Sequence, residues 1–114
     1  MEIGETLTAA SLAEFIGWLE ANHQTKKEIW LVIYKKASGK TGISYDEAVE
    51  AALCFGWIDS IMKSMDAEKR AQRFSPRRKG GNWTQANLAK ARRLIAEGKM
   101  TAAGRAALPD DLDA

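Results

Sequence analysis

A glycine-rich basic segment at residues 73–84 has the residue types that hold an anion. Two of its arginines could form paired hydrogen bonds to phosphate or carboxylate oxygens. Its glycines would let backbone N–H groups approach a ligand, and its tryptophan offers a flat ring for stacking. The start of the helix expected to follow adds partial positive charge. The anion site predicted here consists of Arg73, Arg77, Trp83, Thr84 and Asn87.

The same segment also has a structural interpretation. It matches neither GxxxxGK[ST] nor GxGxxG, the patterns of phosphate-binding loops. Trp83 immediately precedes Thr84, the expected helix cap, and could pack on Leu88 as a hydrophobic staple. The arginines could pair with carboxylates elsewhere in the chain. The sequence leaves the ligand site and the structural role both open.

Trp57 and Asp59 stand two residues apart on an expected strand, so they share one face of it. A carboxylate in a largely apolar strand needs a partner. Arg73 on the neighbouring strand could supply it as a cross-strand pair. If Asp59 instead faces a pocket, it could form the Asp/Arg polar centre of an enzyme, so both residues join the candidate ligand site.

The chain contains one cysteine and one histidine. Cys54 lies in an apolar stretch and is expected to be a buried, inert thiol. His23 ends the first expected helix and has no second histidine or cysteine nearby, so no metal site is predicted. Neither a Ser-His-Asp nor a Cys-His arrangement can be assembled. We therefore expect no catalytic residue of these types and no cofactor.

Capping patterns and periodicity predict the elements that position these residues. Ser11 and Ser44 each precede a glutamate by three residues, which is the capping-box pattern. The helix that begins at Ser11 is expected to fade near residues 21–23, and the helix that begins at Ser44 is expected to end at Gly56. The apolar face of the second helix is expected to be Ala48, Val49, Ala52 and Leu53. Between the two helices, residues 28–35 read as a central strand that is covered on both faces.

The second half of the chain predicts a hairpin followed by two helices. Residues 57–64 and 68–75 read as antiparallel strands that turn at residues 65–67. Thr84 and Thr101 cap the helices, with Gly98 ending the first of them. The predicted fold class is α+β, a small antiparallel sheet of about three strands packed with about four helices, in the order α-β-α-β-β-α-α.

Length and composition predict one domain over residues 1–114, with a core at 11–108 and short flexible ends. No apolar run is long enough to span a membrane, and the start does not have the form of a signal peptide, so a cytoplasmic protein is expected. The net charge of +2 hides an asymmetry. Residues 63–99 hold eleven Lys and Arg but three Asp and Glu, an excess that could steer an anionic partner.

Several ordered motifs resemble one bacterial family. They are Trp18-Leu19-Glu20, the stretch from Ala52 to Asp59, Arg73-Phe74-Ser75-Pro76-Arg77, Trp83-Thr84 with Asn87, and Glu97-Gly98-Lys99-Met100-Thr101 with Gly104. Together they resemble the YdeI/OmpD-associated family, often labelled bacteriocin-protection, over about residues 11–108. The resemblance implies a role in stress or bacteriocin tolerance and supplies no catalytic residues.

Three functional hypotheses follow. The leading one is a binding module for a small anionic ligand or an acidic protein, at the basic segment. The second is a nucleic-acid-binding domain that uses the basic excess together with Lys90, Arg92 and Arg93. The third is an enzyme whose polar centre is Asp59 with Arg73.

Overall fold

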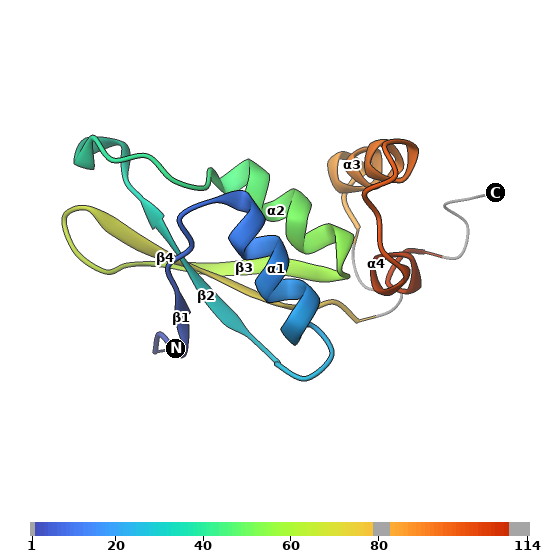
Figure 1. Cartoon of the computed structure of the whole chain (residues 1–114), viewed down its shortest axis with the longest axis horizontal. Helices are drawn as coiled ribbons and strands as arrows, with labels where there is room; N and C mark the ends of the chain where they lie inside the picture. Colours follow the sequence, from blue (N-terminus) through green and yellow to red (C-terminus); the bar gives the residue numbers. More distant parts are fainter. Residues whose placement is uncertain (1, 79–82, 110–114) are drawn as a thin grey trace.

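A mixed four-stranded sheet carries the helices of this protein (Figure 1). A computed structural model describes residues 2–78 and 83–109. Their elements follow in chain order: β1 Thr6–Leu7, α1 Leu12–Asn22, β2 Ile29–Tyr34, the 3-10 helix η1 Lys36–Ser38, α2 Tyr45–Cys54, β3 Trp57–Ser64, β4 Lys69–Pro76, α3 Gln85–Ala96 and α4 Ala102–Ala106. The α+β class is confirmed.

The sheet differs from the expected one. Its strand order is β1-β2-β4-β3, with β1 parallel to β2 and the other neighbours antiparallel. The prediction of a three-stranded antiparallel sheet was therefore wrong by one short parallel strand. Strand β1 has two residues, too few for any alternation to reveal it, and it precedes residue 11, where we expected the core to begin. The central position of β2 is confirmed.

The predicted caps form as hydrogen bonds. Ser44 and Glu47 make the complete capping box of α2. Ser11 caps α1 by accepting from the Glu14 N–H, but the Glu14 carboxylate accepts from the N–H of Ala10, one residue earlier than a capping box requires. At the end of α3, Gly98 has a φ of 74°, the left-handed conformation that favours glycine at this position.

A β-bulge explains the imperfect alternation of β3. Asp59 pairs with Phe74 and Met62 with Gln72, so Ser60 and Ile61 together face the single residue Arg73 of β4. Because β3 has one extra residue here, the side chains of β3 that follow the bulge alternate in the opposite sense from those that precede it. Trp57 and Asp59 therefore share a face that Lys63 does not.

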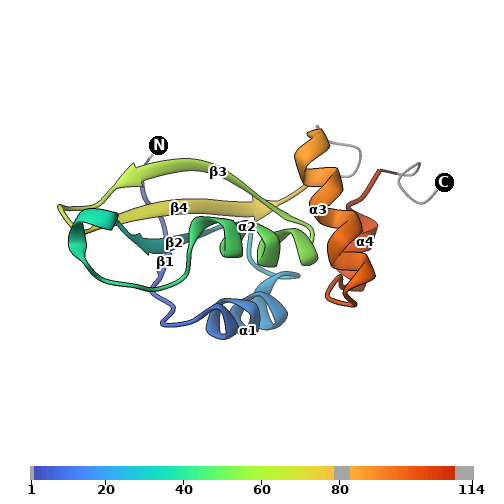
Figure 2. The same cartoon turned by 90° about the horizontal axis from the view of Figure 1, so that it is seen from above.

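Helices α1 and α2 cover one face of the sheet, and α3 and α4 lie beyond one end of it (Figure 2). The core joins the two layers through large buried side chains, among them Phe15, Leu19, Leu31, Trp57 and Phe74. Trp83 and Leu88 each pack against this core. None of the described helices has the length and apolar character that crossing a membrane requires.

Candidate functional site

The Arg77 guanidinium lies over the ring of Trp83, with its central carbon 3.9 Å from the ring centroid. Arg77 follows β4 directly, and its backbone N–H is fixed by the Gly56 carbonyl at 2.8 Å. Burial lowers the pKa of Arg77, and the Asp59 carboxylate opposes this effect. Among the described residues, Arg77 Nε and Trp83 Nε1 are both buried without an acceptor. The structure therefore shows a stacked cation with two buried donors, and anion binding by this pair stays a prediction.

Thr84 and Asn87 serve the helix beside this pair. The Thr84 hydroxyl accepts from the Asn87 N–H at 3.1 Å, which is the N-cap bond of α3. Residues 79–82 of the predicted anion segment lie outside the described residues. The described part thus brings Arg77 next to Trp83 at the start of α3.

Arg73 is already paired within the protein. Its Nε donates to the Glu28 carboxylate at 2.6 Å, and its Nη1 donates to the hydroxyls of Ser60 and Ser75. It stands opposite Trp30 of β2, on the face of the sheet that points away from α1 and α2. Arg73 therefore does not join Arg77 in one site.

Trp57 and Asp59 lie on the helix-covered face. Trp57 is 1% exposed, and its ring meets the ring of Trp18 edge-on with the two centroids 5.8 Å apart. Trp57 is therefore a core residue. Asp59 accepts a 2.5 Å hydrogen bond from the Tyr45 hydroxyl. This bond, together with burial and the negative charge of Asp59, raises the pKa of Tyr45 to about 12. The expected Asp59–Arg73 pair was wrong, because the register places Asp59 opposite Phe74 and turns Arg73 to the other face.

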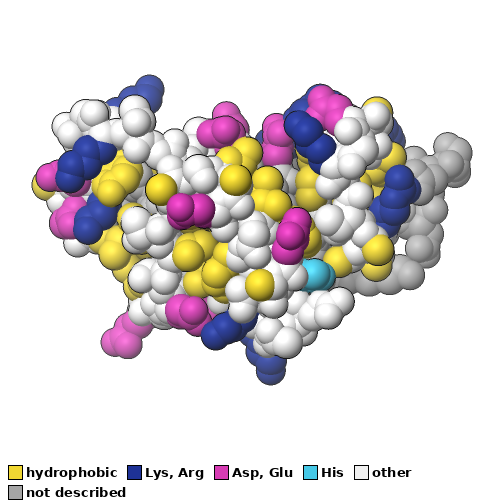
Figure 3. All heavy atoms as spheres, in the orientation of Figure 1, with side chains coloured by type: hydrophobic (Ala, Val, Ile, Leu, Met, Phe, Trp, Pro, Cys, Tyr) yellow, Lys and Arg dark blue, Asp and Glu magenta, His cyan; other side chains and the backbone are white. Residues whose placement is uncertain are grey.

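A concavity of the described residues lies elsewhere, between α1, α2 and the α3–α4 end. We call it the helical groove; it has a volume of about 500 Å³. Figure 3 shows apolar side chains reaching the surface here, with acidic ones on the α1 and α2 side. Its lining is Leu12, Ile16, Glu20, Glu47, Glu50, Ala51, Cys54, Phe55, Leu94, Lys99 and Thr101.

The carboxylates at the rim of the helical groove are only partly paired with cations. Glu50 is paired with Arg93 at 2.5 Å, and Lys99 with Glu97 at 3.3 Å. Within the described part of the chain, no cation lies within ion-pair distance of Glu20 or Glu47. The groove therefore combines apolar walls with two carboxylates available to a positive charge.

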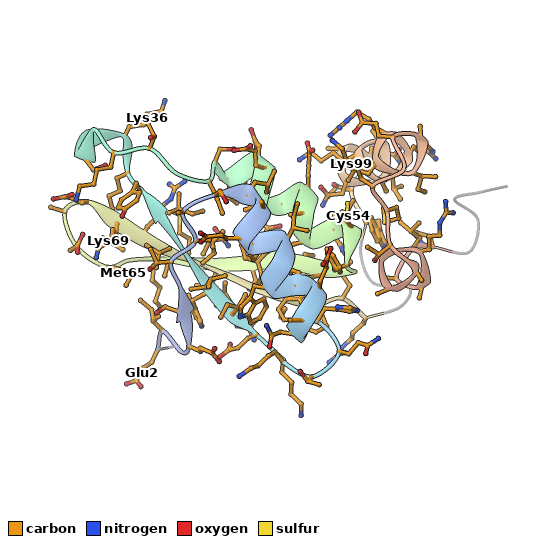
Figure 4. The ribbon with its side chains drawn as sticks, in the orientation of Figure 1. Glu2, Lys36, Cys54, Met65, Lys69 and Lys99 are labelled. Atoms are coloured by element: carbon orange, nitrogen blue, oxygen red, sulfur yellow. The ribbon has the colours of Figure 1, made fainter. Side chains whose placement is uncertain are left out.

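Cys54 closes the groove at the end of α2, where Lys99 lies nearby (Figure 4). Burial, and then the Glu50 carboxylate, raises the pKa of its thiol. The carbonyl of Cys54 accepts from both the hydroxyl and the N–H of Thr101, which fixes the α3–α4 connection beside it. The buried thiol expected from the sequence is confirmed, but the sequence did not predict that it lines a cavity.

A signal for the groove was present in α2. Besides the face predicted as buried, Ala51 and Cys54 are also buried, so the helix is covered on two sides. Glu47, Glu50, Ala51 and Cys54 follow the i, i+3, i+4, i+7 spacing of a single helix face. Ala51 and Cys54, with the acids Glu47 and Glu50 at this spacing, could have indicated that α2 has a second covered face.

Comparison with known protein families gives a match over most of the chain. The family model described as Domain of unknown function (DUF8412) matches residues 7–107. No curated protein and no solved structure matches the chain.

Proposed function

The chain belongs to the DUF8412 family, a domain of unknown function, and we propose that it is a binding module whose helical groove holds a small molecule with an apolar body and one cationic group. The observation that carries this proposal is the groove itself. Its volume of about 500 Å³ lies in the usual range for small-molecule sites. Such sites are mostly apolar, with a few polar groups that orient the ligand.

The apolar walls supply most of the affinity. Leu12 and Ile16 of α1 face Ala51 of α2 and Leu94 of α3 across the groove. Each buried methylene contributes about 0.8 kcal/mol, so an eight-carbon chain could gain about 6 kcal/mol before the costs of association. After those costs, a simple alkylamine should bind weakly, with a Kd on the order of 10 mM.

The carboxylates supply the selectivity. Glu20 and Glu47 extend from α1 and α2 to the rim without a cationic partner among the described residues. A protonated amine at the rim would meet them at little desolvation cost, whereas a carboxylate of equal length would be repelled. The groove should therefore discriminate ligands of equal apolar length by the sign of their charge.

Octylamine and octanoate provide matched probes for a calorimetric titration. We expect octylamine to bind and octanoate to bind at least several-fold more weakly. Glu20→Gln should weaken octylamine by a few-fold, the size expected for a solvent-exposed charge pair. Ile16→Trp should fill the groove and abolish binding of both probes.

Glu14→Gln is the matched control, because Glu14 lies on the same helix outside the groove lining and Gln can keep its bond to the Ala10 N–H. It should leave octylamine affinity unchanged. Equal binding of amine and carboxylate, or unaltered binding in folded Ile16→Trp protein, would remove this function.

A small anionic ligand at Arg77 and Trp83 is the second candidate function. It is supported by the stacked cation and by the two buried donors without acceptors among the described residues. Pyrophosphate should shift the indole N–H resonance of Trp83, and Arg77→Gln should abolish that shift. A shift that survives in Arg77→Gln protein would count against this site. A stress or bacteriocin-tolerance role, implied by the resemblance to the YdeI/OmpD-associated family, remains part of the proposal for either ligand.

A further inference from the structure

A second concavity lies at the opposite end of the molecule from Cys54 and Lys99, near Lys36 (Figure 4). We call it the basic hollow; its volume is about 280 Å³. It lies between the end of β2, the connection that contains η1, and the first turn of α2. Its cationic lining residues are Lys35, Lys36, Lys40 and Arg70, and the rings of Tyr34 and Tyr45 flank them.

The ammonium group of Lys35 is held in place by uncharged oxygens. Its Nζ donates to the Ser64 hydroxyl at 2.6 Å and to the Asp66 carbonyl at 2.7 Å. These bonds come from the β3–β4 hairpin and fix the position of the cation without forming an ion pair with it. Lys40, by contrast, is paired with Glu68 at 2.7 Å. Lys35 therefore keeps an oriented positive charge at the hollow.

Arg70 requires an acceptor more strongly than Lys35 does. It lies inside the sheet, between Ile33 of β2 and Ser64 of β3, so its backbone is rigidly placed. Its Nε is buried and has no hydrogen-bond acceptor among the described residues. A buried donor without an acceptor is costly, and an oxygen that enters the hollow would remove that cost. Neither Arg70 nor Lys36 is in an ion pair with a described residue.

We propose that the basic hollow binds a phosphate group carried by a small molecule, with Arg70 and Lys35 as its main contacts and Lys36 as an outer one. A planar guanidinium beside an ammonium suits the oxygens of a tetrahedral oxyanion. The Glu68 carboxylate, which pairs with Lys40 beside the hollow, would repel a long polyanion, which favours one phosphate group over a nucleic-acid strand. This inference is independent of the helical groove.

Inorganic phosphate is the probe, titrated against chloride at constant ionic strength and followed by amide resonances in the full chain. We expect saturable shifts at residues 33–45 and 64–70. Arg70→Gln should weaken phosphate at least about tenfold, because charge-assisted bonds are the strong ones. Lys36→Gln should weaken it by a few-fold, as expected for an exposed cation.

Two controls separate this site from general charge effects and from Arg77. Lys69→Gln removes a hairpin cation that does not line the hollow, and it should leave phosphate affinity unchanged. Arg77→Gln removes the separate candidate anion site, and it should leave the shifts at residues 33–45 and 64–70 unchanged. Shifts that do not saturate, or an equal loss of phosphate affinity in Lys69→Gln, would overturn the site. A loss of phosphate affinity in Arg77→Gln with none in Arg70→Gln would place phosphate at Trp83 instead. Because Arg70 lies within the sheet, Lys35→Gln gives a second variant should Arg70→Gln fail to fold, and it too should weaken phosphate.

Discussion

Tyr45 and Asp59 form the contact that most changes the chemistry of single residues in this protein. The tyrosine begins α2 and the aspartate lies on β3, so their 2.5 Å bond ties a helix end to the edge strand of the sheet. The hydrogen bond, then burial, then the negative charge of Asp59, all disfavour the phenolate. The carboxylate that the sequence suggested for catalysis thus stabilises structure.

The first prediction concerns the titration of Tyr45. In a Tyr34→Phe background, phenolate absorbance should report a pKa of about 12, and Asp59→Asn should lower it toward the ordinary value of 10.0. Because the folded-state pKa is raised, the bond stabilises the protein fully below pH 10 and its contribution is lost as pH rises toward 12. Tyr45 is 38% exposed, so solvent screening limits this contribution to about 1 kcal/mol or less. A midpoint that Asp59→Asn leaves unmoved would refute this assignment.

The second prediction concerns the thiol of Cys54. Burial and Glu50 raise its pKa, so less of it is thiolate at neutral pH than in an unstructured peptide. Its alkylation by a maleimide should be slower in the folded protein than in urea, and the pH–rate midpoint should lie above that of a free cysteine. Glu50→Gln should move the midpoint downward. As the chain has one cysteine, labelling reports this site alone, and a folded-state rate equal to the unfolded rate would contradict the prediction.

At the scale of elements, α4 approaches the end of α2 so closely that only glycine fits. A Cβ added at Gly104 would overlap the Cys54 carbonyl oxygen and the Met100 sulfur. Gly56, where α2 ends with a φ of 77°, would likewise bring a Cβ to 2.9 Å from the Ala103 carbonyl. This contact positions the α3–α4 end and with it one wall of the helical groove.

The third prediction tests that contact with a matched pair of substitutions. Gly104→Ala should lower the free energy of unfolding in urea by about 1–3 kcal/mol, the usual cost of overpacking. Gly17→Ala, on α1 with open space around its Cβ position, should raise it by about 0.5–1 kcal/mol, because alanine favours helix over glycine. The interpretation of α4 would be wrong if Gly104→Ala behaved like Gly17→Ala.

The sequence predicted the bounds of the helices and strands much better than it predicted which side chains share a face of the sheet. Serine and threonine caps, together with Gly56 and Gly98, set the helix ends, because capping is local chemistry. Strands β3 and β4 fell within a residue of their expected bounds. Pairing register is not local, and the bulge at Ser60 and Ile61 reverses the faces beyond it.

For the candidate site the same limit applies. Arg77 and Trp83 are close in sequence and were brought together as expected. Arg73 and Asp59 lie on neighbouring strands, so their separation depended on a register that the sequence does not display. The helical groove depends on how three helices meet, and only the second apolar stripe of α2 indicated it.

At the scale of the whole molecule, the basic excess of residues 63–99 is divided between two ends. The β3–β4 hairpin tip and α3 lie at opposite ends of the long axis (Figure 1). Of the cations on α3, Arg93 is paired with both Glu50 and Glu97. The charge asymmetry seen along the chain is therefore spread in space, which favours separate small-ligand sites over one extended nucleic-acid surface.

We propose that the helical groove holds an apolar chain with its cationic group at the Glu20 and Glu47 rim. Isotope-filtered nuclear Overhauser contacts between unlabelled octylamine and labelled protein test it most directly. We expect contacts from the alkyl protons to Leu12, Ile16 and Leu94, with the protons next to nitrogen nearest Glu20 and Glu47. Contacts confined to other surfaces, or an alkyl chain lying in the groove with its nitrogen directed away from both glutamates, would contradict it.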